Sequence, residues 1–368
     1  MKDLYIPTQI KFLAMFLLIG MFLTGCSRGP IQASSWPGVT LADNTLYIAY
    51  NQFVQAIDLE TEREIWRYPA EADRSQTFYA PPAISSDGLV ILGGYDQKVY
   101  ALSTVSSRPE TVWVFEEATD RIIGGPAISG EIVLVPSADH KLYALDLNNG
   151  QPVWNQPFES DHALWSAPLV DRDTVYLASL DHTVYALDLE SGSLIWENDL
   201  GSAISDTPSL SNGLLLCGTF EGILFALDKE TGREEWHFES GAAIWGNPVV
   251  KDDVVYVANV DRDAFALDLA NGNELWHQTL SSSASTSPLV SDETVYFASE
   301  EGAVEAFMID GGDPAWPSSA SILGRLLADP ILVDDELFVP VMENSECIVF
   351  GVNAVTGSAR CVVQIDEG

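Results

Sequence analysis

The chain has 368 residues, of which 47% are hydrophobic and 19% are charged. This length and composition suffice to bury a core, and they exclude an intrinsically disordered chain and a small disulfide-stapled domain. Seventeen lysines and arginines stand against 54 aspartates and glutamates, a net charge of −37 that repels phosphate backbones and argues against nucleic-acid binding.

The first 25 residues have the pattern of a signal peptide. A weakly basic start precedes an apolar run over residues 12–23, which is too short for a standard membrane span. The run leads into the segment LTGC, which resembles the bacterial lipoprotein cleavage box and predicts lipidation of Cys26. An ordinary secretory signal or an uncleaved anchor is the alternative. Residues 26–33 would then form a lipidated tether.

Cleavage before Cys26 would leave 15 basic and 53 acidic residues, a net charge of −38. The predicted location is the cell envelope, with the protein held by its lipid. If the host has two membranes, the uncharged Ser27 favours the periplasmic face of the outer membrane. Otherwise the outer face of the cytoplasmic membrane is expected.

A unit of about 40 residues recurs along the rest of the chain. The segments LYALDLNNGQPVW, VYALDLESGSLIW, LFALDKETGREEW and AFALDLANGNELW are its clearest copies. A proline precedes each unit, and the spacings between these prolines are 45, 44, 42, 40, 40, 40 and 42 residues. The repeated segments and the prolines both indicate eight units, and such internal repetition is the signature of a repeat architecture.

Each unit reads as short strands joined by tight turns. Val, Tyr, Leu and Phe dominate runs that are bounded by Asp, Gly and Asn. A helical repeat would need a period of 3.6 and few Gly or Pro, whereas this chain has 27 Gly and 19 Pro. The sequence therefore predicts an all-β fold over residues 34–368: an eight-bladed β-propeller of four-stranded antiparallel blades.

The pattern VYALD-x-x-x-G-x-x-x-W resembles the quinoprotein-type (PQQ-like) propeller repeat, in which the tryptophan docks between neighbouring blades. Two branches of this family compete: the PQQ-dependent dehydrogenases, and the BamB-like lipoproteins that serve as scaffolds in outer-membrane protein assembly. In the eighth unit Cys361 stands where the tryptophan is expected. The resemblance implies a structural, blade-docking role for seven tryptophans: Trp66, Trp113, Trp154, Trp196, Trp236, Trp276 and Trp316.

The sequence does not have the features that the family resemblance would imply for a quinone enzyme. The dehydrogenases carry a disulfide of adjacent cysteines and long insertions between blades, and this sequence has neither. The five histidines have no ligand spacing, so no metal site and no cofactor are predicted. Cys347 and Cys361 fall on the last two predicted strands, where a disulfide is possible in an oxidising envelope.

Residues that break the repeat are the candidates for function, because features shared by every blade belong to the fold. Five of them lie just before the innermost strands and could line one mouth of the ring. The sequence thus favours a non-enzymatic, monomeric scaffold that binds an envelope protein. A PQQ-dependent oxidoreductase and a ligand-sensing surface propeller remain the alternatives. The candidate partner-binding residues are Trp165, Asp206, Trp245, Asn247 and Asp329.

Overall fold

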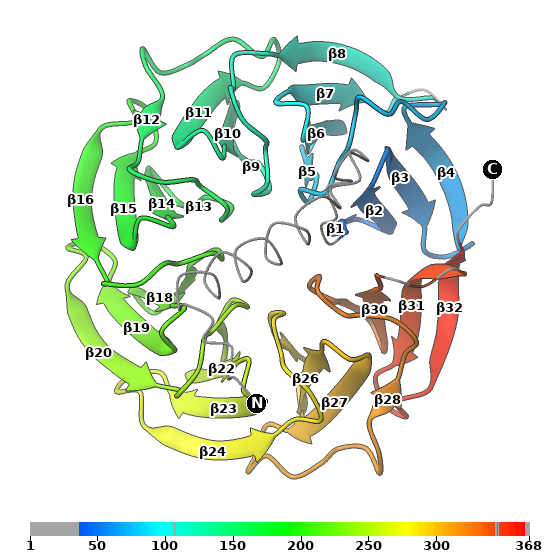
Figure 1. The fold of residues 1–368 in the computed structure, drawn as a ribbon, viewed down its shortest axis with the longest axis vertical. Helices are drawn as coiled ribbons and strands as arrows, with labels where there is room; N and C mark the ends of the chain where they lie inside the picture. Colours follow the sequence, from blue (N-terminus) through cyan, green and yellow to red (C-terminus); the bar gives the residue numbers. More distant parts are fainter. Residues whose placement is uncertain (1–36, 106–107, 343, 345, 365–368) are drawn as a thin grey trace, which may run out of the picture. The chain divides into compact units, whose positions relative to one another are not determined.

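The described part of the chain forms eight four-stranded antiparallel sheets arranged as the blades of a propeller (Figure 1). The computed structural model describes residues 37–105, 108–342, 344 and 346–364. The signal segment, the tether and Cys26 lie outside the described residues. The predicted eight-bladed, all-β fold is confirmed. Within the described ranges, no helix has the length and apolarity needed to cross a membrane.

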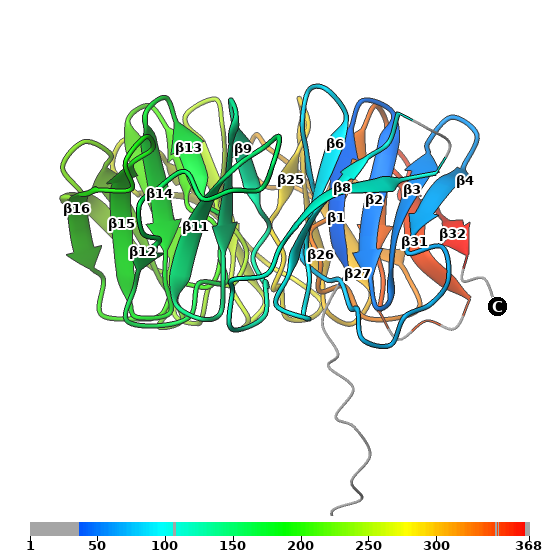
Figure 2. The same ribbon diagram turned by 90° about the horizontal axis from the view of Figure 1, so that it is seen from above.

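Each blade is continuous in sequence, and its strands run in chain order across the sheet (Figure 2). The strands of blades 1–4 are β1 (Gly38–Ala42), β2 (Thr45–Tyr50), β3 (Phe53–Asp58) and β4 (Arg63–Tyr68); β5 (Ala83–Ile84), β6 (Leu89–Gly93), β7 (Val99–Ser103) and β8 (Glu110–Phe115); β9 (Ala127–Ser129), β10 (Ile132–Pro136), β11 (Lys141–Asp146) and β12 (Phe158–Glu159); β13 (Leu169–Asp171), β14 (Thr174–Ala178), β15 (Thr183–Asp188) and β16 (Leu194–Asp199).

Blades 5–8 repeat this arrangement. Their strands are β17 (Ser209–Ser211), β18 (Leu214–Gly218), β19 (Ile223–Asp228) and β20 (Glu234–Glu239); β21 (Val249–Lys251), β22 (Val254–Ala258), β23 (Asp263–Asp268) and β24 (Glu274–Thr279); β25 (Leu289–Val290), β26 (Thr294–Ser299), β27 (Ala303–Met308) and β28 (Ala320–Ser321); β29 (Ile331–Val333), β30 (Glu336–Pro340), β31 (Cys347–Asn353) and β32 (Ala359–Gln364).

The first strand of each blade begins at the residue directly after the repeated proline. Pro168, for example, precedes β13 directly, and Pro248 precedes β21. A proline fits there because it lies at the start of the strand and has no N–H to contribute to the ladder. The innermost strands have only two to five residues.

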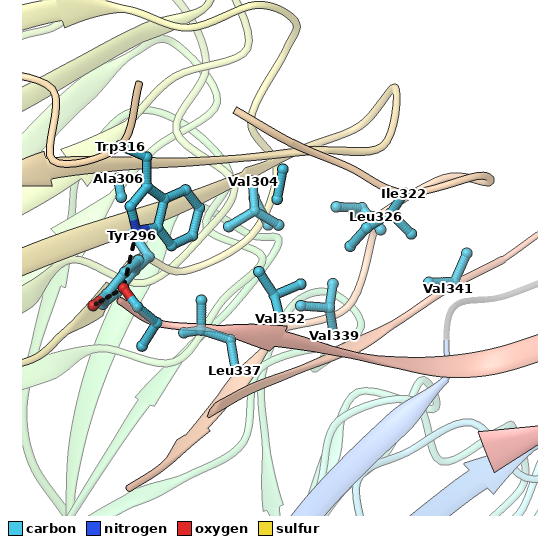
Figure 3. Close-up of a cluster of buried hydrophobic side chains, with 13 residues drawn as sticks. Tyr296, Val304, Ala306, Trp316, Ile322, Leu326, Leu337, Val339, Val341 and Val352 are labelled. Carbon is cyan, nitrogen blue, oxygen red and sulfur yellow. Dashed lines mark hydrogen bonds between the residues drawn. The ribbon is translucent and has the colours of Figure 1, made fainter. Parts of the chain in front are cut away.

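The two middle strands of a blade are buried on both faces. In β15, the side chains of Val184, Tyr185, Ala186 and Leu187 are all buried. Both faces of a blade pack against neighbouring blades, so these strands read as continuous apolar runs and not as a strict alternation. The core consequently lies between the blades, as in the cluster that joins blades 7 and 8 around Trp316 (Figure 3).

Strand alternation divides the turns between two mouths of the ring. Blade-to-blade connections and the turns between second and third strands lie at one end, which we call the connection mouth. The backbone N–H of Phe220, in such a turn, donates to the carbonyl of Ala203 in the preceding connection at 3.0 Å. The turns between first and second strands, and between third and fourth strands, lie at the opposite mouth.

The ring closes where blade 8 meets blade 1. Among the described residues, no strand from one end of the chain joins the sheet formed by the other end. The ring-closing interface therefore depends on side-chain contacts, including Leu46 and Ile48 of blade 1 against Phe338 and Val349 of blade 8.

Candidate functional site

In six of the blades a docking tryptophan connects the blade to the next one at the opposite mouth. The indole Nε1 of Trp236 donates to the carbonyl oxygen of Leu269 at 2.9 Å. Its ring covers Gly272, where an added Cβ would lie 2.6 Å from Cε3 of the indole. The same N–H···O contact, at 2.8–3.2 Å, joins Trp113 to Leu147, Trp154 to Leu189, Trp196 to Lys229, Trp276 to Ile309 and Trp316 to Ala354.

In five blades an alanine on the adjacent strand makes room for the indole. Trp196 pairs with Ala186, and a β-bulge sets the strand register beside this pair. Blades 1, 2, 5 and 6 have the same alanine–tryptophan pairing. Six of the seven docking tryptophans are buried, and Trp196 is partly buried. Most of the surface of these rings is therefore occupied by contacts within the ring of blades.

Blade 8 differs from the others in strand register. Cys361 has the chain position of the tryptophan, but the bulge has moved toward the end of β32. As a result Arg360, and not Cys361, pairs with Gly351, the counterpart of the alanine. Cys361 is joined to Cys347 in a disulfide, with 5.9 Å between their Cα atoms. Bulges on either side of Val349 bring together two cysteines that a regular ladder would offset.

All five candidate binding residues lie in blade-to-blade connections at the connection mouth. Asp206 and Asn247 lie in the connections that lead into blades 5 and 6, and Asp329 lies in the connection that leads into blade 8. Trp165 and Trp245, which enter blades 4 and 6, expose 37% and 41% of their surface. The structure thus places two indoles in contact with solvent, and it places the three polar candidates two or three residues before the innermost strands of their blades.

Asn247 and Asp329 take part in hydrogen bonds that join the connections of neighbouring blades. The N–H of Asn247 donates to Ser287 Oγ at 2.9 Å. The N–H of Ser287 donates to Asp329 Oδ1 at 2.7 Å, and its hydroxyl donates to Asp329 Oδ2 at 2.8 Å. On the preceding blades, the N–H of Ala167 donates to Thr207 Oγ1 at 3.1 Å. This arc fixes the positions of the connections from which the tryptophans project.

Sequence reasoning missed Thr207 and Ser287, although a simple signal could have found them. Both occupy the position immediately before the repeated proline, as do Asn247 and Asp329. That position is polar in blades 5–8 but holds Pro81, Gly125 and Ala167 in blades 2–4. The polar arc therefore covers one half of the ring.

Asp206 and Asp329 both have pKa values raised above the ordinary value for an aspartate. Burial raises the pKa of Asp206 well above its ordinary value, and the negative charge of Asp329 raises it further. Burial also raises the pKa of Asp329, against the lowering effect of its hydrogen bonds from Ser287. The Asp329 side chain is accessible to solvent, but the surrounding protein still desolvates its carboxylate.

Aromatic side chains surround the same mouth. The ring of Trp245 stacks on Phe220 with 5.2 Å between centroids and an interplanar angle of 13°. On blade 2, Tyr79 lies 5.0 Å from Tyr95, and the guanidinium of Arg121 lies 5.5 Å above the Tyr95 ring. Stacking restricts the motion of these rings, and side chains that are already ordered lose less entropy when they enter an interface.

The described residues offer no preformed metal centre. Within the described ranges, no three His, Cys, Asp or Glu side chains gather into a group that could hold an ion. Cys217 is a free, buried thiol, and desolvation raises its pKa. A buried thiol of this kind packs as a small apolar side chain and is unreactive.

Comparisons with known proteins agree with this architecture. The chain is similar to the crystal structure of BamB from Moraxella catarrhalis, with 21% identity, 84% of this chain and 96% of that chain covered, and a TM-score of 0.70. It is also similar to the computationally designed Ika8 protein, with 15% identity, 78% and 86% covered, and a TM-score of 0.63. At these identities the likeness shows the fold alone.

The family comparison covers nearly the whole chain. No curated protein sequence matches it. A family model described as outer membrane protein assembly factor BamB matches residues 28–179, 159–244 and 221–367. The chain therefore belongs to the BamB family of PQQ-like repeat propellers.

Proposed function

We propose that this protein is a non-enzymatic, lipid-anchored scaffold that binds another envelope protein through its connection mouth. The observation that carries the proposal is the pair of half-exposed indoles, Trp165 and Trp245, on a rigid ring. Tryptophan is among the residues that dominate the energy of protein interfaces, and loops on a rigid scaffold are common docking sites. The family description supports a role in outer-membrane protein assembly as the specific form of this function.

The docking role is tested by truncating both indoles. Trp165→Ala combined with Trp245→Ala should abolish co-purification of an outer-membrane assembly component with the tagged, full-length protein. The matched control is Ile195→Ala combined with Leu275→Ala, which removes apolar side chains of 52% and 53% exposure from the outer strands of the same two blades. Equal retention of the partner by both double variants would contradict the proposal.

The anchor is tested separately at Cys26. A diacylglyceryl group with an added N-acyl chain gives stable membrane attachment, whereas one acyl chain is marginal. Cys26→Ala should release the protein into the soluble fraction or leave the precursor uncleaved. Mass spectrometry that finds an unmodified Cys26 thiol in the mature protein would argue against lipidation.

The enzyme alternative has its own assay. Purified protein incubated with PQQ and Ca²⁺ should show neither dye-linked oxidation of alcohols or sugars nor a rise in melting temperature. Quinone-dependent turnover would replace the scaffold proposal with that of an oxidoreductase.

A further inference from the structure

A groove marks the ring-closing interface at the opposite mouth, far from the exposed indoles in the topology of the blades. It encloses about 870 Å³ between the turns of blade 1 and those of blade 8. Leu59, Val333 and Phe338 form its apolar lining. Glu60, Asp334 and Asp335 line it with exposed carboxylates.

The groove corresponds to the place that an indole fills elsewhere in the ring. In six interfaces, a docking tryptophan donates to a carbonyl of the next blade. The acceptor is the residue that follows the Asp of the VYALD segment, a position held by Met308 in blade 7 and Asn353 in blade 8. The residue at the acceptor position in blade 1 is Leu59, which lines the groove. Among the described contacts, no donor reaches the Leu59 carbonyl.

The ring-closing interface replaces the indole with an arginine. Arg360 has the ladder position of the tryptophan, and Glu62 has the chain position of the glycine that an indole covers. Arg360 Nη2 lies 2.6 Å from Glu62 Oε1 and 2.9 Å from Glu336 Oε1. The guanidinium is thus held by carboxylates from both blades and lines the groove as a flat, cationic surface.

These features together define the chemistry of an occupant. An aromatic ring can stack on a guanidinium plane and fill the apolar lining, as the indoles do in the other interfaces. The carboxylates of Glu60, Asp334 and Asp335 form no ion pair among the described residues, and they would attract cations. We infer that the groove binds a segment of a partner protein in which an aromatic residue is flanked by lysine or arginine.

This inference concerns a second surface and goes beyond the function proposed for the connection mouth. It is tested with the purified mature protein and a fluorescently labelled peptide of sequence Gly-Lys-Trp-Lys-Gly, by fluorescence anisotropy. We expect saturable binding that weakens with added salt. Peptides in which the tryptophan is replaced by alanine, or both lysines by glutamate, should lose it.

Two sets of variants locate the binding. Asp334→Asn combined with Asp335→Asn should weaken binding by about tenfold. The matched control, Asp252→Asn combined with Asp253→Asn, alters the corresponding turn of blade 6, where the interface with the next blade is filled by Trp276. It should leave the affinity unchanged.

Arg360→Trp combined with Glu62→Gly should rebuild the standard contact, abolish peptide binding and preserve the fold. Absence of binding to the unaltered protein, or equal weakening by the blade 6 control, would overturn the inference. The Trp165→Ala, Trp245→Ala variant should bind the peptide normally, so failure of either proposal can be told from failure of the other.

Discussion

Arg360 bridges the last blade to the first through Glu62, with 2.6 Å between Nη2 and Oε1. At the other interfaces the corresponding contact pairs a tryptophan with a glycine in six cases. Glu62 adopts a φ of +54°, so the turn has kept the left-handed conformation that the glycine normally provides. The ion pair thus replaces a buried apolar contact with an exposed polar one, and exposed pairs contribute at most about 1 kcal/mol.

The ring-closing interface should consequently open before the others. We expect amide hydrogen exchange in β2, β3 and β31 to precede exchange in the equivalent strands of blades 4–6, because local opening follows the least stabilised contacts. Reducing the disulfide between Cys347 and Cys361 should enlarge the difference. Uniform protection across all blades would show that side-chain contacts at this interface compensate for the missing indole.

Truncating a docking tryptophan should destabilise the ring substantially. Trp236→Ala removes a buried ring and its hydrogen bond to Leu269, and we expect a loss of about 3–5 kcal/mol in the free energy of unfolding. Urea denaturation would measure it, with Trp165→Ala as the control because that indole is partly exposed. Similar losses in both variants would mean that docking contributes little beyond general burial.

The glycine beneath the indole can be tested against a glycine of similar backbone conformation. Gly272 has a φ of +70°, and an added Cβ would collide with Trp236. Gly241 has a φ of +88°, and nothing lies within 4 Å of an added Cβ. Gly272→Ala should therefore cost about 1–3 kcal/mol more than Gly241→Ala, the usual cost of overpacking. Equal unfolding midpoints for the two variants would mean that Gly272 is needed only for the conformation of its turn.

The carboxyl pair at the connection mouth should make stability depend on pH. Because the pKa of Asp206 is raised in the folded protein, the folded state binds more protons than the unfolded state above the ordinary value of 3.8. Its contribution to stability is therefore fully present below that value and is lost as the pH rises through the raised pKa. Asp206→Asn should raise the melting temperature at pH 8 but not at pH 3.5. A constant difference across this range would exclude linkage to Asp206.

The sequence alone was sufficient to predict the number of blades and the strands within them. The recurring proline, the VYALD run and the tryptophan at a fixed spacing specify strand, turn and inter-blade contact within about 40 residues. Eight such units can bury their faces only against one another, which makes ring closure the one compact solution. The same local regularity placed the seven docking tryptophans, and it pointed to the connections that carry Trp165 and Trp245.

Only the tertiary structure decided how the ends of the chain meet and which polar groups interact. The shifted bulge in β32 places Arg360 in the indole's ladder position, which counting from the repeated glycine could not reveal. Asp206 and Asp329 are 123 residues apart in sequence, yet in the folded ring the negative charge of Asp329 raises the pKa of Asp206. Sequence periodicity predicts the contacts between neighbouring blades, whereas interactions between distant blades depend on the geometry of all eight blades together.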